Sequence, residues 1–181
     1  MIVQDSRIAG LYQFVPQPHH DERGFFTRTF DVDVARSVGV DPDAFVQDSL
    51  SRSAYGVIRG LHLRSGRGES KLVRCSSGRV FDVVVDLRPS SPSYLVWESF
   101  DLSGDRQNSI YVPAGCAHGI QALSEVADVS YRIDREHDPS EDVTVVYDDP
   151  DLAIAWPLPP TMMSARDSEA PRFREVLAAL P

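Results

Sequence analysis

The chain has 181 residues, with 18 Lys and Arg against 27 Asp and Glu, so its formal net charge is −9. This acidic balance argues against nucleic acid as the main partner, because phosphate binding needs a basic surface. There is no run of roughly 20 apolar residues for a membrane span, no signal-peptide pattern at the start and no C-x-x-C pair, so a cytoplasmic protein without a membrane partner is expected.

A chain of this length is expected to form one domain over residues 1–181. In chain order, the predicted elements are a short helix at 31–38, strands at 71–75, 79–88, 94–102, 109–112, 118–123 and 127–133, and a C-terminal helix that begins at Pro171 and aligns Phe173, Val176, Leu177 and Leu180. Within 79–88, Asp82 and Asp86 lie opposite an apolar face. Short strands at regular spacing predict an all-β sandwich or barrel with a few peripheral helices.

Alternation within the strands also predicts which polar side chains point into the interior. The polar residues that share a face with apolar neighbours are His62, Lys71, His118 and Tyr131. A lone lysine or histidine is costly in an apolar interior, so their convergence indicates a polar pocket. Arg59 has the opposite parity from His62, which counts against both reaching that pocket, although a bulge at Gly60 could re-aim one of them.

A metal site is a competing interpretation of the same residues. His62, Glu69 and His118 supply two imidazoles and a carboxylate, a set that suits Fe(II), Mn or Zn. The run P-x-G-x-x-H at 113–118 resembles the second motif of cupins, whereas the second histidine of the first cupin motif is replaced by Arg64. Because a guanidinium cannot ligate a cation, a pocket without metal is the preferred interpretation.

Eight motifs run through most of the chain in a fixed order. They are DERGFF (21–26), GVIRGLHLR (56–64), KLVR (71–74), GRVFDVVVDLR (78–88), SPSY (91–94), YVPAGCAHG (111–119), DDPDLAIAWP (148–157) and MSARD (163–167). This combination resembles the dTDP-4-dehydrorhamnose 3,5-epimerase family of cupin-fold sugar-nucleotide epimerases. The resemblance implies a cupin-type jelly-roll barrel, a homodimer that exchanges N-terminal strands, no metal or other cofactor, and a nucleotide-diphosphate sugar as substrate.

The implied reaction is epimerisation at C3, C5 or both, beside the 4-keto group of a sugar nucleotide of the dTDP-4-dehydro-6-deoxyglucose type. The resemblance makes His62 the base, Asp167 its partner, Tyr131 the acid and Lys71 the cation near the ketone. These residue types suit the chemistry, because a neutral imidazole can remove a proton beside a ketone and an ammonium stabilises the resulting enolate. The substrate contacts that carry over are Arg23, Gln47, Arg59, His118 and Glu141.

Four further expected substrate contacts depart from the family's pattern. Arg28 follows DERGFF where the family has an acidic residue, Ser49 replaces an amide, His137 replaces the aromatic that stacks on the base, and Arg166 replaces a lysine. The sequence therefore leaves open the nucleotide base and the number of inverted centres. A non-catalytic carbohydrate-binding barrel is the third interpretation, but a sugar binder has no need of a base, an acid and a cation together.

Overall fold

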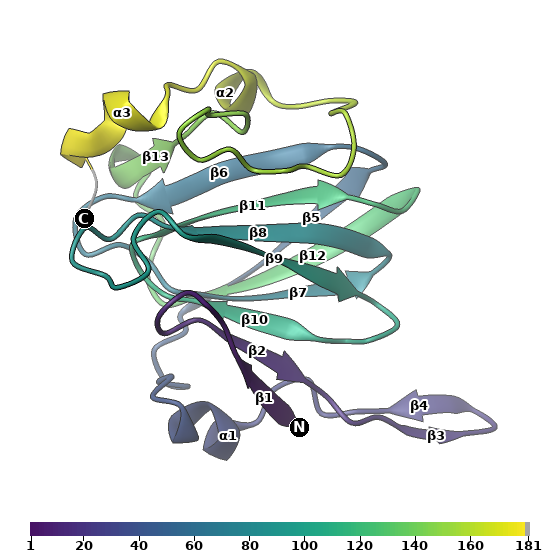
Figure 1. The fold of residues 1–181 in the computed structure, drawn as a ribbon. Helices are drawn as coiled ribbons and strands as arrows, with labels where there is room; N and C mark the ends of the chain where they lie inside the picture. The colour runs from purple at the N-terminus through teal and green to yellow at the C-terminus, as the bar shows by residue number, and fades with distance from the viewer. Residues whose placement is uncertain (180–181) are drawn as a thin grey trace.

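The chain folds into two antiparallel sheets that face each other, as the computed structural model of residues 1–179 shows (Figure 1). The six-stranded sheet has, in spatial order, β1 (Ile2–Asp5), β2 (Tyr12–Val15), β10 (Ser109–Val112), β7 (Lys71–Ser77), β12 (Val126–Ile133) and β5 (Gln47–Ala54). The five-stranded sheet has β13 (Asp142–Thr144), β6 (Ile58–Arg64), β11 (Cys116–Ala122), β8 (Arg79–Asp86) and β9 (Trp97–Ser103). This confirms the all-β jelly-roll class, with eleven of the thirteen described strands divided between two sheets rather than closed into one barrel.

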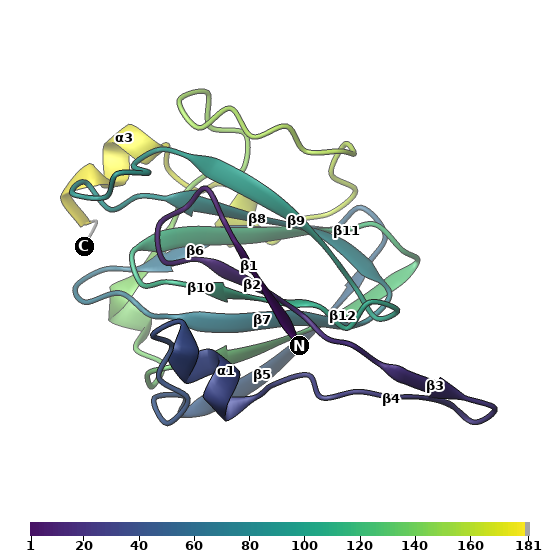
Figure 2. The ribbon, with the colours of Figure 1, turned by 60° about the horizontal axis from the view of Figure 1, so that its bottom comes forward.

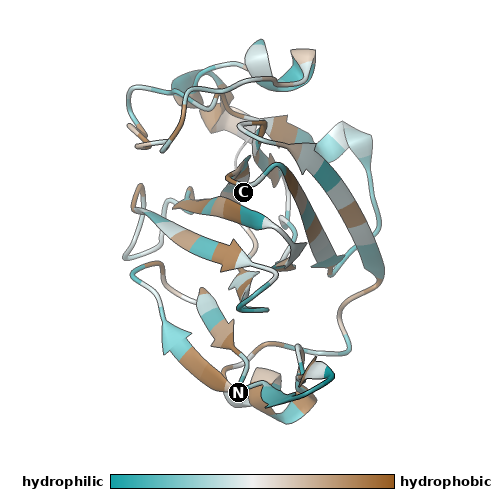
Figure 3. Cartoon of the chain, turned by 90° about the vertical axis from the view of Figure 1, so that its right-hand side faces the viewer, coloured by the Kyte–Doolittle hydropathy of each residue, from teal (hydrophilic) through white to brown (hydrophobic). Residues whose placement is uncertain are grey.

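Three apolar clusters hold these layers together. Side chains such as Val73, Val84, Ile120 and Val129 fill the space between the sheets. A second cluster covers the outer face of the five-stranded sheet with residues from the C-terminal segment, and a third packs the N-terminal strands against α1 (Val32–Ser37). Along the strands, hydrophobic and hydrophilic bands alternate (Figure 3). This alternation is why one side of a strand can carry core residues while the other serves a different layer.

Helices are short and peripheral, as predicted. The helix expected at 31–38 is α1, where the Asp31 side chain accepts hydrogen bonds from the first backbone N–H groups. Near the C-terminus are α2 (Ala165–Ser168), α3 (Phe173–Val176) and the 3₁₀ turn Leu177–Ala179, with another 3₁₀ turn at Pro139–Glu141. None of the described helices is long and apolar enough to cross a membrane.

A small hairpin stands apart from the two sheets. Strands β3 (His19–Asp21) and β4 (Gly24–Phe26) pair with each other, and in two views they project away from the rest of the molecule (Figures 1 and 2). Phe26, the last residue of β4, is 77% exposed, and Phe25 beside it is also exposed. Large apolar side chains in this position mark the hairpin as a candidate contact surface.

Among the predicted boundaries that differ from the structure, two have a clear local cause. The strand expected from Tyr94 begins at Trp97, because Tyr94 and Val96 donate backbone hydrogen bonds within a tight turn and Leu95 has a left-handed φ of 64°. The C-terminal helix begins at Phe173 rather than Pro171, because Arg172 has extended backbone angles and caps it. The expected helix position of Leu180 lies outside the described residues.

Candidate active site

A polar cavity of about 210 Å³ lies between the two sheets. Its walls are formed by Ser51, Arg59, His62, Lys71, His118, Ile120 and Tyr131. The five predicted interior or binding residues among them therefore come together, although they are drawn from four different strands. Cationic and imidazole groups dominate this lining, which gives an acidic protein a local site suited to an anionic ligand.

The closest polar contact at the cavity joins His62 to Asp167. The Nε2 atom of His62 lies 2.6 Å from Oδ1 of Asp167, whose side chain is almost fully buried. Burial raises the pKa of the Asp167 carboxyl, but the hydrogen bond and charge of His62 and the Gly60 N–H outweigh it and hold that pKa below its usual value. Asp167 is thus an ionised partner that fixes the imidazole and can stabilise its protonated form.

The short helix α2 brings Asp167 to this position. Ser164 precedes it in an extended conformation, and its Oγ accepts a hydrogen bond from the Asp167 N–H at 3.1 Å. This N-cap turns the MSARD segment back against β6, where His62 lies. The predicted pairing of two residues that are 105 positions apart is confirmed as a contact.

A bulge in β6 corrects the expectation for Arg59. Along β11 the pairing moves from His118 to Ile120, two residues, while along β6 it moves from His62 to Arg59, three residues. The extra residue restores Arg59 to the cavity face, where its Nε donates to Ser53 Oγ at 2.9 Å. Strict alternation is therefore broken, and Arg59 and His62 line one pocket.

Gly60 makes this bulge possible. Its φ is +126°, and a Cβ on it would lie 2.6 Å from the Gly119 Cα and 2.8 Å from the His118 carbonyl oxygen. No larger residue fits without moving the neighbouring strand. The glycine in RGLH thus has a geometric role beside that of its histidine.

Lys71 and Tyr131 occupy the wall opposite His62. They come from β7 and β12, neighbours in the six-stranded sheet, whereas His62 belongs to the five-stranded sheet. The Tyr131 hydroxyl lies 3.3 Å from Ser51 Oγ, and burial raises the pKa of this phenol to about 12. Tyr131 is therefore a protonated donor throughout the neutral pH range. The inward direction predicted for both residues is confirmed.

His118 faces the cavity beside a carboxylate that the sequence did not single out. Its Nε2 lies 2.9 Å from both oxygens of Asp82, which is fully buried. Burial raises the pKa of Asp82, and the attraction of His118 acts in the opposite direction. The aspartate face of β8 is an interior face, because Val80 and Val84 on it belong to the core between the sheets. That shared face was the available signal for Asp82.

The remaining predicted contacts do not line the cavity. Arg23 lies on the exposed hairpin and pairs with Asp21, while Arg28 pairs with Asp31 at 2.6 Å at the start of α1. On β5, Ser49 stands opposite Tyr131 and Gln47 opposite Ile133, but neither forms the wall.

Three more predicted contacts lie around the loop after β12 and near α2. The Nδ1 atom of His137 lies 2.6 Å from an Arg64 guanidinium nitrogen, and Glu141 forms an ion pair with Arg135. Arg166 donates to Asp142 at 3.0 Å. These residues are bound to protein partners instead of facing the cavity in this structure.

The three candidate ligands of the competing metal interpretation are each engaged by other protein partners. Glu69 contacts Arg64 and Lys71, His62 contacts Asp167, and His118 contacts Asp82. Residues 1–179 contain no cluster of three or more His, Cys, Asp and Glu side chains in metal-binding geometry.

Ser51 is the other cavity residue that sequence reasoning missed. It lies on β5, a strand whose polar sequence QDSLSRSA lacks the apolar alternation needed to predict it. The position of Ser51 follows from the register of β5 against β12, which is known only from the folded sheet.

Comparisons of the sequence and the fold with known proteins all find members of one family. Residues 5–175 match the family model described as dTDP-4-dehydrorhamnose 3,5-epimerase. The chain is 39% identical to the enzyme of that name from Pseudomonas aeruginosa, covering 93% of each chain, and 38% identical to a dTDP-4-dehydrorhamnose 3-epimerase from Streptomyces niveus, covering 90% of this chain and 79% of the relative. It also resembles the structure of a dTDP-6-deoxy-D-glucose-3,5-epimerase from Legionella pneumophila in complex with dTDP-4-keto-L-rhamnose, with a TM-score of 0.93, 37% identity and coverage of 99% and 97%.

Proposed function

The chain belongs to the dTDP-4-dehydrorhamnose 3,5-epimerase family, and from this membership we infer that it is an isomerase acting on a 4-keto-6-deoxy sugar nucleotide in deoxysugar biosynthesis. Inversion is proposed at C3, C5 or both, and dTDP is the proposed nucleotide. The observation that carries the proposal is the 2.6 Å contact of His62 with a buried carboxylate at a cavity that also holds Lys71 and Tyr131.

His62 is proposed to remove the proton from the carbon beside the ketone. Its contact with Asp167 fixes the orientation of the ring, and the negative charge of that carboxylate favours the imidazolium formed as the proton arrives. The electrons left behind move into the carbonyl, which becomes an enolate. Lys71 is proposed to stabilise that oxygen, a preorganised electrostatic contribution that is worth roughly 3–4 kcal/mol per donor in comparable sites.

Tyr131 is proposed to return a proton from the opposite side of the sugar. This role is supported by the fold, because base and acid stand on facing sheets with the cavity between them. A ring bound in this cavity presents one face to His62 and the other to Tyr131. Removal on one face and delivery on the other inverts the centre.

Binding of the nucleotide diphosphate is proposed to use Arg59 and His118 at the cavity wall. Gln47, Ser49, His137, Glu141 and Arg166 are proposed to contribute as the substrate reaches beyond it, together with Arg28. In this structure Arg166 and Glu141 are held by ion pairs, so substrate contacts would replace or share those partners.

Incubation in D₂O tests the reaction directly. With dTDP-4-dehydro-6-deoxyglucose, the protein is expected to introduce deuterium at C3, C5 or both, as read by NMR of the recovered sugar nucleotide. The labelled position reports which carbon loses its proton, and the coupling constants of the product show whether that centre is inverted. Binding of the nucleotide sugar without any ring exchange would instead support a carbohydrate-binding protein.

Two copies are proposed to pair by exchanging N-terminal strands. The proposal is supported by the projecting β3–β4 hairpin, which carries exposed Phe25 and Phe26 and whose Arg23 does not line the His62 cavity of its own chain. Exchange gives the two phenylalanines an apolar contact and offers Arg23 to the partner's substrate.

Light scattering after gel filtration checks this assembly. We expect a dimer of about 40 kDa, twice the 20.1 kDa chain. Replacing Phe25 and Phe26 with serine should shift the population to monomers and raise KM, because the apolar contact is lost. A monomeric wild-type protein would contradict the proposal.

A further inference from the structure

Three charged side chains form a buried network directly beside the cavity. Arg64, Glu69 and Lys71 are 4%, 8% and 7% exposed. The two oxygens of Glu69 are shared: Oε1 lies 3.0 Å from Lys71 Nζ, and Oε2 lies 2.6 Å from Arg64 Nε. The Nε–H of Arg64 does not point along the second contact, so it is an ion pair rather than an aligned hydrogen bond.

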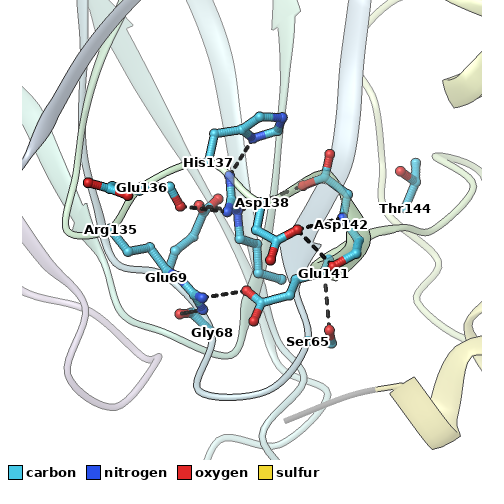
Figure 4. A network of polar contacts seen from close by, with 12 residues as sticks. Ser65, Gly68, Glu69, Arg135, Glu136, His137, Asp138, Glu141, Asp142 and Thr144 are labelled. Atoms are coloured by element: carbon cyan, nitrogen blue, oxygen red, sulfur yellow. Dashed lines mark hydrogen bonds and ion pairs between the residues drawn. The ribbon is translucent and has the colours of Figure 1, made fainter.

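Arg64 is in turn held by the loop that follows β12. One guanidinium nitrogen donates to the Glu136 carbonyl oxygen at 3.0 Å, and another lies 2.6 Å from His137 Nδ1 (Figure 4). Because arginine can only donate, His137 accepts through Nδ1. The guanidinium therefore cannot swing away, and it fixes the side of Glu69 that faces it.

The charge balance makes Glu69 important to Lys71. Burying an ammonium is costly unless an anion compensates it, and Glu69 is the carboxylate within ion-pair distance of Lys71 among residues 1–179. Without Glu69, the ammonium would have no carboxylate within ion-pair distance among the described residues, whereas the Arg64 guanidinium would still have Asp142 Oδ1 at 3.7 Å. The other titratable and charged groups that surround the cavity end of Lys71 are Arg59, His62, Asp82, His118 and Tyr131.

We propose that Glu69 is a positioning residue that keeps the Lys71 ammonium charged and aimed into the cavity, and that Arg64 holds Glu69 for this task. The proposal rests on the proposed function for its catalytic consequence, since Lys71 is the group that meets the substrate ketone. Its physical content does not depend on that reaction. Glu69 need not touch the sugar, because it acts through Lys71.

The test uses the fact that Lys71 is the only lysine of the chain. Labelling with lysine carrying ¹³C at Cε gives one side-chain signal, whose pH titration reports Lys71 directly and needs no substrate. In Glu69→Gln the titration midpoint is expected to fall by about one pH unit or more, because the compensating charge is gone. Deuterium exchange into the substrate should slow about 10- to 100-fold, as expected for a displaced catalytic group.

Arg64→Gln is a second variant, for which the Lys71 titration midpoint is expected to shift in the opposite direction. Removing this cation leaves the whole carboxylate to Lys71, so the midpoint should rise while exchange still slows through the loss of positioning. This variant decides the question if Glu69→Gln fails to fold. Midpoints that stay within about 0.3 pH unit of wild type, or that move together in one direction, would overturn the proposal.

Asp86→Asn is the matched control. Asp86 is a fully buried carboxylate at the last residue of β8 and does not line the cavity, and although burial raises its pKa, hydrogen bonds from Arg88, Ser91 and Ser93 bring it to about 2. Its contribution to stability is present above pH 4 and is lost as the pH falls toward 2, so the variant should be less stable at neutral pH. Its Lys71 midpoint should not move. Absence of exchange in wild type would refute the proposed function, while the titrations would still decide the role of Glu69.

Discussion

His62→Ala is expected to abolish deuterium exchange into the substrate. His62 is the cavity imidazole whose contact with the Asp167 carboxylate equips it to receive a proton, and an alanine methyl group cannot accept one. Loss of a general base costs about 10²- to 10⁴-fold in rate, so exchange should fall to the detection limit. The measurement is the NMR intensity of the C3 and C5 protons during incubation in D₂O.

Rescue by added imidazole separates lost chemistry from lost structure. The space left by the side chain adjoins the cavity, so free imidazole can enter and restore part of the exchange. Thermal unfolding of the variant should remain cooperative, because His62 is partly exposed and is not a core residue. Exchange at the wild-type rate in this variant would remove His62 from the role of base.

Tyr131→Phe is expected to separate exchange from inversion. His62 would still remove the proton and return a deuteron to the same face, so label enters the sugar. Inversion should fall about 10²- to 10⁴-fold, because the phenylalanine ring occupies the same wall without a proton to donate. NMR of the product distinguishes the two results, since a labelled sugar that keeps its configuration differs from the epimer in its coupling constants.

Tyr111→Phe is the control for this experiment. Tyr111 lies on β10 in the same sheet, and burial raises the pKa of its phenol too, but it is not part of the cavity. Its variant should both exchange and invert normally. If Tyr131→Phe inverted as fast as wild type, or lost exchange as completely as His62→Ala, the assignment of the acid would be wrong.

The sequence could predict much of this site because strand alternation is a local property. Lys71, His118 and Tyr131 share faces with core residues, and each points inward as that pattern requires. Asp167 could not be found in this way. It comes from a four-residue helix far along the chain, and only the resemblance of MSARD to a family motif indicated its partner.

Strand alternation did not predict side-chain direction where that direction depends on neighbouring strands or covering segments. Arg59 reaches the cavity because a neighbouring strand accepts a bulge at Gly60, and no pattern within β6 states how many residues that bulge adds. Asp82 was placed opposite an apolar face, yet both faces of β8 are covered, one by the opposing sheet and one by the C-terminal segment. In a strand buried on both sides neither face is outward, so the only indication in the sequence that Asp82 is interior is that Val80 and Val84 share its face.

Because base and acid lie on facing sheets, the packing of the core between the sheets affects the distance between the two catalytic side chains. Sheets pack about 10 Å apart, and the side chains between them set that spacing. Here Val73, Val84 and Val129 fill the same layer into which the cavity opens. A change of one methylene among them alters the gap that a sugar ring must bridge from His62 to Tyr131. Core residues that line no part of the cavity are thus expected to affect turnover as well as stability when they are replaced.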